Sequence, residues 1–225
     1  MRYDMHTHSK YSPDSILEPR AIVKRGRKRG LAGVAVTDHN TIKGGLEAKR
    51  YETEDFKVIV GSEIMTDRGE IIGLFLNAEV EPGEFEAVIE GIKEQGGIVV
   101  VPHPFDRIRP GLQPTDEDAK FFDCIEGFNS RCLFQSYNKR AVEFASRHKL
   151  PVTAGSDAHF GWEIGNAFIR ANADTRSEEE LRRDILKNNG IEYEGRLSNP
   201  LNQCLSKVLK IWRRVCYDYS HESHK

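Results

Sequence analysis

The chain has few cysteines, and none of them lies in a pattern typical of a disulfide framework or a structural zinc site. There is no Cys-x-x-Cys pair among the four widely spaced cysteines, which are Cys124, Cys132, Cys204 and Cys216. A small secreted scaffold held by disulfides is therefore excluded, and so is a zinc ribbon built on thiolates. We expect free thiols in a reducing, cytoplasmic environment.

Long apolar runs and an excess of one charge are also missing. No stretch approaches the roughly 18 apolar residues that a membrane-spanning helix needs, and no basic and then apolar leader opens the chain. The 33 Lys and Arg residues against 35 Asp and Glu give a formal net charge of −2. We therefore expect a soluble, unprocessed protein with no transmembrane segment and no stable nucleic-acid partner.

Apolar runs that end in metal-ligating side chains are the dominant feature of the chain. Five strand-like runs, near residues 3–8, 31–36, 57–61, 98–101 and 151–155, are separated by stretches that include helical patterns. A single histidine at the end of a buried strand is usually structural, but five strand ends of this kind indicate a common site. The ligand-type side chains at these ends are Asp4, His6, His8, Asp38, His39, Glu63, His103, Asp157 and His159.

Alternating strands and helices over 225 residues suit one α/β barrel domain. The carboxyl ends of parallel barrel strands converge at one rim, where such barrels carry their active sites. The ligand set mixes imidazoles and carboxylates, which suits zinc, manganese or iron better than calcium. Because it exceeds the needs of one ion, we predict two to three divalent metal ions, an arrangement suited to phosphoryl transfer.

Four further segments carry predictions, and for three of them the sequence leaves two interpretations open. Asp14, in the polar loop after the first strand, is either a turn residue or a metal ligand. The irregular, cationic segment 105–111 is either a solvated loop or a phosphate clamp. The prolines on both sides of His103 predict an extended backbone there. The run 71–76 predicts an antiparallel or peripheral strand that brings no ligand to the site.

A basic amphipathic helix is predicted over residues 205–219. Apolar residues including Leu205, Val208, Trp212 and Val215 recur at helical spacing, with lysines and arginines between them. Packing against the barrel or a second subunit is the simplest interpretation, and contact with a membrane surface or nucleic acid is the alternative. We assign residues 196–225 to a C-terminal extension that contains this helix, and residues 1–195 to the hydrolase domain.

The ordered motifs of the chain resemble those of the polymerase and histidinol phosphatase (PHP) superfamily. The resemblance covers roughly residues 1–195 and implies a distorted (β/α)7 barrel with a di- or trinuclear metal site at its C-terminal rim. Within the superfamily, the chain resembles the group of small stand-alone PHP phosphoesterases. The motifs are Asp4-Met5-His6-Thr7-His8, Thr37-Asp38-His39-Asn40, Gly61-Ser62-Glu63, His103-Pro104 and Gly155-Ser156-Asp157-Ala158-His159.

The resemblance also implies how the ligands are shared among the ions. The first ion would be held by His6, His8, Glu63 and Asp157. A second would be held by Glu63 and His103, and a third by Asp14, His39 and His159. Many relatives add a histidine or cysteine to the second ion, where this chain has Asn129, a poorer ligand. Asp4 is expected to support the ligands or to bind weakly.

We therefore predict a metal-dependent phosphoesterase that hydrolyses a phosphomonoester, such as a nucleotide or a small metabolite phosphate, with a metal-bridging hydroxide as the attacking group. The candidates for neutralising the phosphate are Arg107, Arg109 and Arg131. The candidates for assisting leaving-group protonation are Asp38 and His159.

Two other functions stay open. The first is a phosphodiesterase or exonuclease that acts on short oligonucleotides, for which Phe105, Phe128 and Phe134 are candidates to stack on bases. The second is a noncatalytic metal-binding regulatory module whose C-terminal helix recruits a partner. The same helix makes the chain a candidate homo-oligomer.

Overall fold

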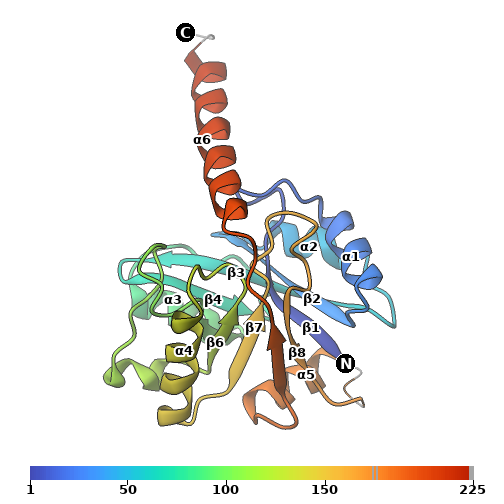
Figure 1. Ribbon diagram of the computed structural model, residues 1–225, viewed down its shortest axis with the longest axis vertical. Helices are drawn as coiled ribbons and strands as arrows, with labels where there is room; N and C mark the ends of the chain where they lie inside the picture. The colour runs from blue at the N-terminus through green and yellow to red at the C-terminus, as the bar shows by residue number, and fades with distance from the viewer. Residues whose placement is uncertain (174, 176, 223–225) are drawn as a thin grey trace.

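A computed structural model describes residues 1–173, 175 and 177–222, with the backbone alone for 217–222. Its strands form one sheet in the order β7-β6-β5-β4-β3-β2-β1-β8-β9, and the strands from β1 to β7 curve into a nearly closed barrel (Figure 1). The predicted distorted α/β barrel is confirmed. The strands are β1 (Arg2–Thr7), β2 (Gly33–His39), β3 (Lys57–Thr66), β4 (Gly69–Leu74), β5 (Ile98–Val101), β6 (Cys124–Asn129), β7 (Val152–Gly155), β8 (Ala167–Arg170) and β9 (Glu192–Gly195).

Helices cover the outside of the barrel, except for the last one. The helices are α1 (Pro19–Lys28), α2 (Lys43–Lys49), α3 (Phe85–Glu94), α4 (Gln135–His148), α5 (Glu178–Leu186) and α6 (Leu201–Glu222), with a 3-10 helix η1 (Asp116–Phe121). The α5 helix begins at a capping box, in which Ser177 Oγ accepts from the backbone N–H of Glu180. None of the described helices is both long and apolar enough to cross a membrane.

The apolar core lies on both faces of the sheet. Inside the barrel, Met5, Ala35, Ile59 and Val100 pack together, and two further clusters fill the space between the strands and the outer helices. This two-sided burial explains why β5, with the sequence Ile-Val-Val-Val, is continuously apolar. The strand ends are therefore supported by a packed apolar core on both faces of the sheet.

The barrel closes where the end of β1 meets the segment after β7. Thr7 forms a parallel bridge with Ala158. The backbone N–H of Asp157 donates to the carbonyl of His6 at 2.7 Å, and that of His8 donates to the carbonyl of Ala158 at 2.9 Å. This contact places two motifs that are about 150 residues apart in the chain side by side.

The β4 strand departs from the expected pattern. It is antiparallel to both neighbours, as the short turn before it predicts, but it lies between β3 and β5 within the barrel wall. Because it runs in the opposite direction, its first residues lie at the rim where the parallel strands end. Buried Glu70 lies there beside the candidate ligands. It precedes the predicted run 71–76, so the prediction that this run brings no ligand to the site did not take Glu70 into account.

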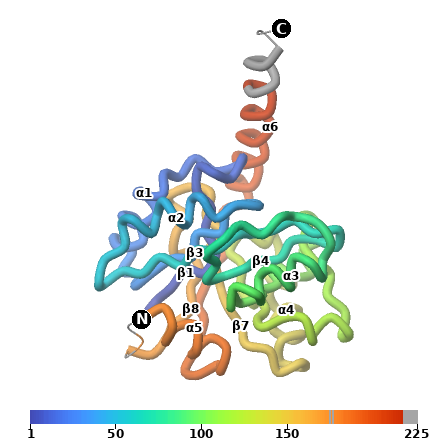
Figure 2. The backbone as a smooth tube through the Cα atoms, turned by 180° about the vertical axis from the view of Figure 1, so that it is seen from behind, coloured from blue at the N-terminus to red at the C-terminus, as the bar shows by residue number. Residues whose placement is uncertain are grey.

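The last strand and the last helix differ most from the sequence-based expectation. All four residues of β9 are exposed, so the strand has no apolar pattern to mark it. The α6 helix rises from the barrel, and its far end stands clear of the other elements (Figures 1 and 2). Leu205, Val208 and Trp212 are 50%, 63% and 60% exposed. The apolar side of α6 therefore does not pack against the barrel.

Candidate metal centre

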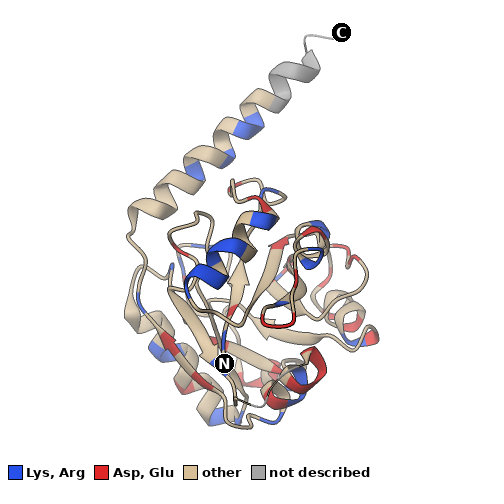
Figure 3. Ribbon diagram, turned by 90° about the vertical axis from the view of Figure 1, so that its right-hand side faces the viewer, with Lys and Arg blue, Asp and Glu red and all other residues tan. Residues whose placement is uncertain are grey.

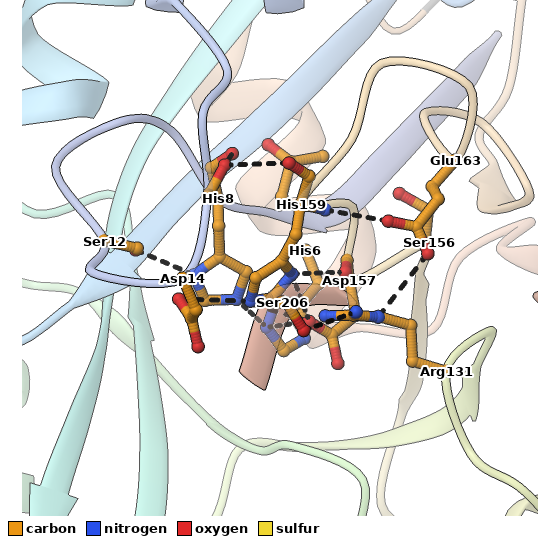
Figure 4. Close-up of polar contacts among 12 residues, drawn as sticks. His6, His8, Ser12, Asp14, Arg131, Ser156, Asp157, His159, Glu163 and Ser206 are labelled. Atoms are coloured by element: carbon orange, nitrogen blue, oxygen red, sulfur yellow. Dashed lines mark hydrogen bonds and ion pairs between the residues drawn. The ribbon is translucent and has the colours of Figure 1, made fainter. Parts of the chain in front are cut away.

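The predicted ligands meet at one end of the barrel, and Figure 4 shows five of them together: His6, His8, Asp14, Asp157 and His159. The β1, β2 and β3 strands carry His6, His8, His39 and Glu63 to this end or just past it, and the segment after β5 carries His103. Asp157 and His159 follow β7, and Asp14 comes from the loop after β1. Five strands and the segments that follow them thus deliver the eight expected side chains to one place. The described part of the chain contains three groups whose ligand atoms lie within 4.8 Å of one another: His6, His8 and Asp157; His8, His39 and His159; His39, Glu63 and Glu70.

Two imidazole nitrogens face each other at the centre of the first group. His6 Nε2 lies 3.0 Å from His8 Nε2. Around this pair, Glu63 Oε2 and Asp157 Oδ1 lie 3.4 and 3.3 Å from His8 Nε2. All four residues are buried.

The hydrogen-bond partners of the two rings fix their tautomers. His6 Nδ1 lies 2.9 Å from Glu126 Oε1, and His8 Nδ1 lies 3.0 Å from Ser12 Oγ. Ser12 Oγ donates its own hydrogen to Asp38, so it accepts from His8. Each Nδ1 therefore carries a proton. Burial lowers the pKa of His6, but the charges of Glu126, Asp157 and Glu63 outweigh burial and raise this pKa well above its ordinary value. A bound cation would take the place of the proton on His6 Nε2, and this set of nitrogen and oxygen donors fits such a cation.

The pKa of His8 agrees with a ligand role. Burial, followed by the neighbouring rings of His159 and His39, lowers the pKa of His8 to about 3. The ring is therefore neutral at physiological pH, and its Nε2 lone pair is available.

The third expected group gathers around Asp14. Its Oδ2 lies 3.4 Å from His39 Nε2, and its Oδ1 lies 3.3 Å from His159 Nε2. Asp14 Oδ1 is buried and has no hydrogen-bond partner. His159 Nδ1 lies 2.9 Å from the carbonyl of Asp157, so the proton is on Nδ1 and Nε2 is free to bind. The carboxylate of Asp14 thus faces two histidines, as a ligand would.

The second expected group includes a carboxylate that the sequence motifs did not indicate. His103 Nε2 lies 2.9 Å from Glu63 Oε1. The Glu70 oxygens lie 3.7 Å from His103 Nε2 and from His39 Nδ1. Burial, and then the charge of Glu63, raise the pKa of Glu70 to about 7. A bound cation would offset this repulsion between two buried carboxylates.

The backbone at His103 is not extended. Its φ is +31°, so the prediction from the flanking prolines is wrong. The backbone N–H of His103 donates to Glu126 Oε2 at 2.7 Å, and the other oxygen of the same carboxylate binds His6. Glu126 thus holds two candidate ligands at once and stabilises the left-handed conformation.

Asn129 is held by hydrogen bonds rather than directed at the three groups as a ligand. Its Nδ2 donates to Glu126 Oε2 at 2.9 Å and to Asp157 Oδ2 at 3.2 Å. Its Oδ1 accepts from Arg109 at 3.2 Å and from the backbone of Arg131 at 2.9 Å. The side chain that the resemblance aligns with a ligand of the second ion therefore supports its neighbours by hydrogen bonds.

Two buried aspartates support the loops beneath the ligands. Asp4 accepts from the backbone N–H and hydroxyl of Ser156 at 2.8 and 2.5 Å. Asp38 accepts from the backbone and hydroxyl of Ser9, both at 2.6 Å, and from Ser12 Oγ at 2.7 Å. Both oxygens of Asp38 are thus engaged behind His8. Serines such as Ser12 carry no spacing signal, so the sequence did not reveal this support.

The three arginine candidates have different surroundings. Arg109 donates to Asp106 at 2.9 Å and forms a close ion pair with Asp157. Arg131 is buried, and its Nη2 donates to the carbonyl of Asn202 at 2.7 Å and to Ser206 Oγ at 2.8 Å. Arg107 is exposed. Arg109 and Arg131 line the cavity over the ligands, and Arg107 does not.

That cavity has a volume of about 140 Å³. Its walls contain candidate ligands from each of the three groups and, from α6, the side chains of Gln203, Ser206, Lys207 and Lys210. A larger hollow of about 1110 Å³ lies near α4, β8 and β9, and no candidate ligand lines it.

The comparisons with known proteins agree with this geometry. A family model for PHP-associated domains matches residues 135–189. An uncharacterised protein of Methanocaldococcus jannaschii is 47% identical over 142 residues, which cover 58% of this chain and 82% of that protein. A 5′-3′ exoribonuclease of Haemophilus influenzae is 40% identical over 78 residues, which cover 32% of this chain and 28% of that protein.

A solved structure extends the likeness to most of the fold. It is a two-domain protein from Bacteroides vulgatus that contains a predicted PHP-like metal-dependent phosphoesterase. It superimposes with a TM-score of 0.73 at 20% identity, over 87% of this chain and 65% of that one. The chain thus spans slightly less than two thirds of that protein. The solved structure, at 20% identity, shows the shared fold. The match to the PHP-associated family model, together with the ordered motifs and their convergence at one rim, shows that the chain belongs to the PHP superfamily.

Proposed function

We propose that the chain is a metal-dependent phosphoesterase that removes a terminal phosphate from a small phosphorylated compound. The observation that carries this proposal is the convergence of imidazole nitrogens and carboxylates beneath a cavity of about 140 Å³. Cavities that enclose a whole drug-sized ligand usually measure roughly 300–1000 Å³. A phosphate group therefore suits this cavity, and the remainder of the substrate would stay outside it.

The residues of the centre divide into proposed metal ligands and residues that orient those ligands. We propose His6, His8, Glu63 and Asp157 for one ion, Glu63, His103 and Glu70 for a second, and Asp14, His39 and His159 for a third, with manganese, zinc or iron as the metal. Bound ions of this kind activate water and offset the charge of phosphate oxygens. Glu126 and Ser12 orient His6 and His8, as carboxylates and hydroxyls behind metal-binding histidines do.

The other roles fall to groups around the cavity. Arg109 brings positive charge to the cavity wall beside Asp157. Of the two candidates for the leaving group, His159 lines the cavity, whereas the oxygens of Asp38 are engaged by serines. We therefore retain His159 and not Asp38 beside the leaving group. Because His159 Nε2 is proposed as a metal ligand and its Nδ1 donates to the carbonyl of Asp157, a water next to this ring would carry the proton.

A phosphodiesterase or exonuclease is the second candidate function. The similarity to an exoribonuclease over 78 residues favours it. An internal phosphodiester, however, needs space on both sides of the scissile group. Phe105 and Phe128 are only 7% and 6% exposed, so of the three candidate stacking residues only Phe134, at 56%, is accessible to a base. These observations favour a terminal phosphate.

Phosphate release with manganese, zinc and iron in parallel tests the proposal. We expect His6→Ala and Asp157→Ala each to reduce phosphatase activity to background, because both side chains contribute to one group of ligand atoms. His148→Ala and Asp55→Ala are the matched controls, since neither residue lies at the centre. Full activity of both site variants after metal reconstitution would contradict the assignment. Nucleotide release from a short oligomer, without phosphate release, would support the second candidate.

A further inference from the structure

The C-terminal helix turns its polar side toward the candidate metal centre. Four of its side chains line the same cavity as His39 and His159, and their positions, 203, 206, 207 and 210, fall on one helical face. The apolar residues Leu205 and Val208 face away and are 50% and 63% exposed. An amphipathic helix usually buries its apolar side against its own domain. The reversed orientation indicates that the polar side of α6 acts at the cavity.

Two arginines fix the helix in this orientation. Arg131, next to the end of β6, donates to the carbonyl of Asn202 and to Ser206 Oγ, and Figure 4 shows Arg131 and Ser206 together with the ligands. Farther along the helix, Arg213 Nη1 donates to the carbonyl of Ser12 at 2.9 Å. Ser12 is also the residue that holds His8. The helix is therefore tied to two different loops of the site.

Lys207 and Lys210 are the available cations of the cavity wall. The other two cations there are engaged: Arg109 pairs with Asp106 and Asp157, and Arg131 binds α6. Both lysines are exposed, and within the described residues neither ammonium has an ion-pair or hydrogen-bond partner. Figure 3 shows the basic residues along this helix. Among the described residues, these two ammonium groups are therefore the cations of the cavity wall that are free to pair with an anion.

We propose that Lys207 and Lys210 bind a second anionic group of the substrate, outside the small cavity that takes the phosphate to be removed. The inference rests on the proposed function. The two residues are three positions apart, so they lie on the same face of the helix, within reach of one anionic group. An ammonium is a flexible point charge that suits phosphate and carboxylate oxygens. The substrate class is therefore a phosphomonoester that carries a further phosphate or carboxylate.

Matched substrates test this assignment by steady-state kinetics. Propyl phosphate carries one anionic group, whereas propane-1,3-diol bisphosphate and 3-phosphooxypropanoate carry two. We expect Lys207→Gln and Lys210→Gln each to raise KM for the doubly anionic substrates about tenfold, since a hydrogen bond to a charged group is lost. KM for propyl phosphate should stay within about twofold in each variant, as expected for a lysine that contacts only the second group.

Arg214→Gln is the matched control. It removes one positive charge from the same helix, and Arg214 is exposed and does not line the cavity. We expect this variant to behave as the unaltered protein with every substrate. Circular dichroism checks that all variants keep the fold.

A binding measurement separates the two proposals. Calorimetry with the non-hydrolysable propane-1,3-bisphosphonate should show weaker binding to both lysine variants and unchanged binding to Arg214→Gln. If the protein hydrolyses monoesters but the lysine variants keep their KM values, the lysine assignment is overturned and the proposed function stands. An equal rise in KM for singly and doubly anionic substrates also overturns it. If lysine-dependent binding occurs without hydrolysis of any monoester, only the proposed function fails.

Discussion

At the scale of single residues, the candidate centre depends on spacing that the sequence shows and on contacts that it does not. His6 and His8 are two positions apart at the end of β1, so the sequence predicts that their side chains point to the same face of the sheet. Glu70 was not predicted, because it begins an antiparallel strand instead of following a parallel one. The assignment of Arg131 to phosphate is not supported by its contacts, since its partners lie on a helix whose position no sequence pattern fixes.

Glycine at position 155 is required by the closure of the barrel. A Cβ atom there would lie 2.2 Å from the Cβ of His6 and 2.7 Å from its backbone nitrogen. We expect Gly155→Ala to lower the free energy of unfolding by about 3 kcal/mol, because backbone cannot move aside cheaply. Gly83→Ala is the control, since nothing lies within 4 Å of its added carbon. Equal stability of the two variants in urea denaturation would rule out this close approach.

The two carboxylates near His159 are expected to hold different ions. Asp157 belongs with His6 and His8, whereas Asp14 faces His39 and His159. We therefore expect Asp157→Asn and Asp14→Asn each to lose about one metal equivalent, with different affinities for the ions that remain. Metal analysis after dialysis, together with titration of the depleted proteins, measures this. Identical titration curves for the two variants would mean that both carboxylates serve one ion.

At the scale of secondary structure, α6 is the element whose role changed most. Its amphipathic pattern predicted a helix, but the pattern does not say which side meets the barrel. Because α6 contributes to the cavity wall, we propose that residues 196–225 act together with residues 1–195 instead of forming an independent extension. The exposed apolar side remains available for a second copy of the chain.

Self-association through that side is testable with α6 intact. Leu205, Val208 and Trp212 are spaced by three and four residues and are each at least 50% exposed, a pattern typical of helix pairs. We expect the unaltered chain to sediment as a dimer and the triple variant Leu205→Gln, Val208→Gln, Trp212→Gln to sediment as a monomer. Lys207 and Lys210 are unchanged in this variant, so turnover should remain. A monomer in both cases would contradict the proposal.

At the scale of the whole molecule, the barrel brings many like charges to one end and thereby links stability to metal binding. Glu63, Glu70, Asp14 and Asp157 all line one cavity.

The barrel class was predictable from alternating strands and helices, whereas β9 was not, since its exposed residues give no periodic signal. The closure between β1 and β7 also lay beyond sequence patterns, because it depends on pairing between distant segments.

Metal should therefore raise the melting temperature of the protein. At a free metal concentration of about 100 times Kd, binding stabilises the folded state by about 2.7 kcal/mol. For a chain of 225 residues, this corresponds to a rise of about 5–10 °C. Differential scanning fluorimetry of chelator-treated protein with and without manganese or zinc measures it. His6→Ala should show a smaller rise, and an equal rise in both proteins would place the stabilising metal elsewhere.

The pairing of β1 with the segment after β7 also sets the order of events when the chain is made. His6 and His8 leave the ribosome first, but the backbone of Asp157 that pairs with His6 follows about 150 residues later. Until then the two histidines lack both their carboxylate neighbour and the hydrogen bonds that fix the end of β1. The candidate metal centre is thus incomplete until Asp157 has been synthesised, and the α6 residues that line its cavity follow later in the chain.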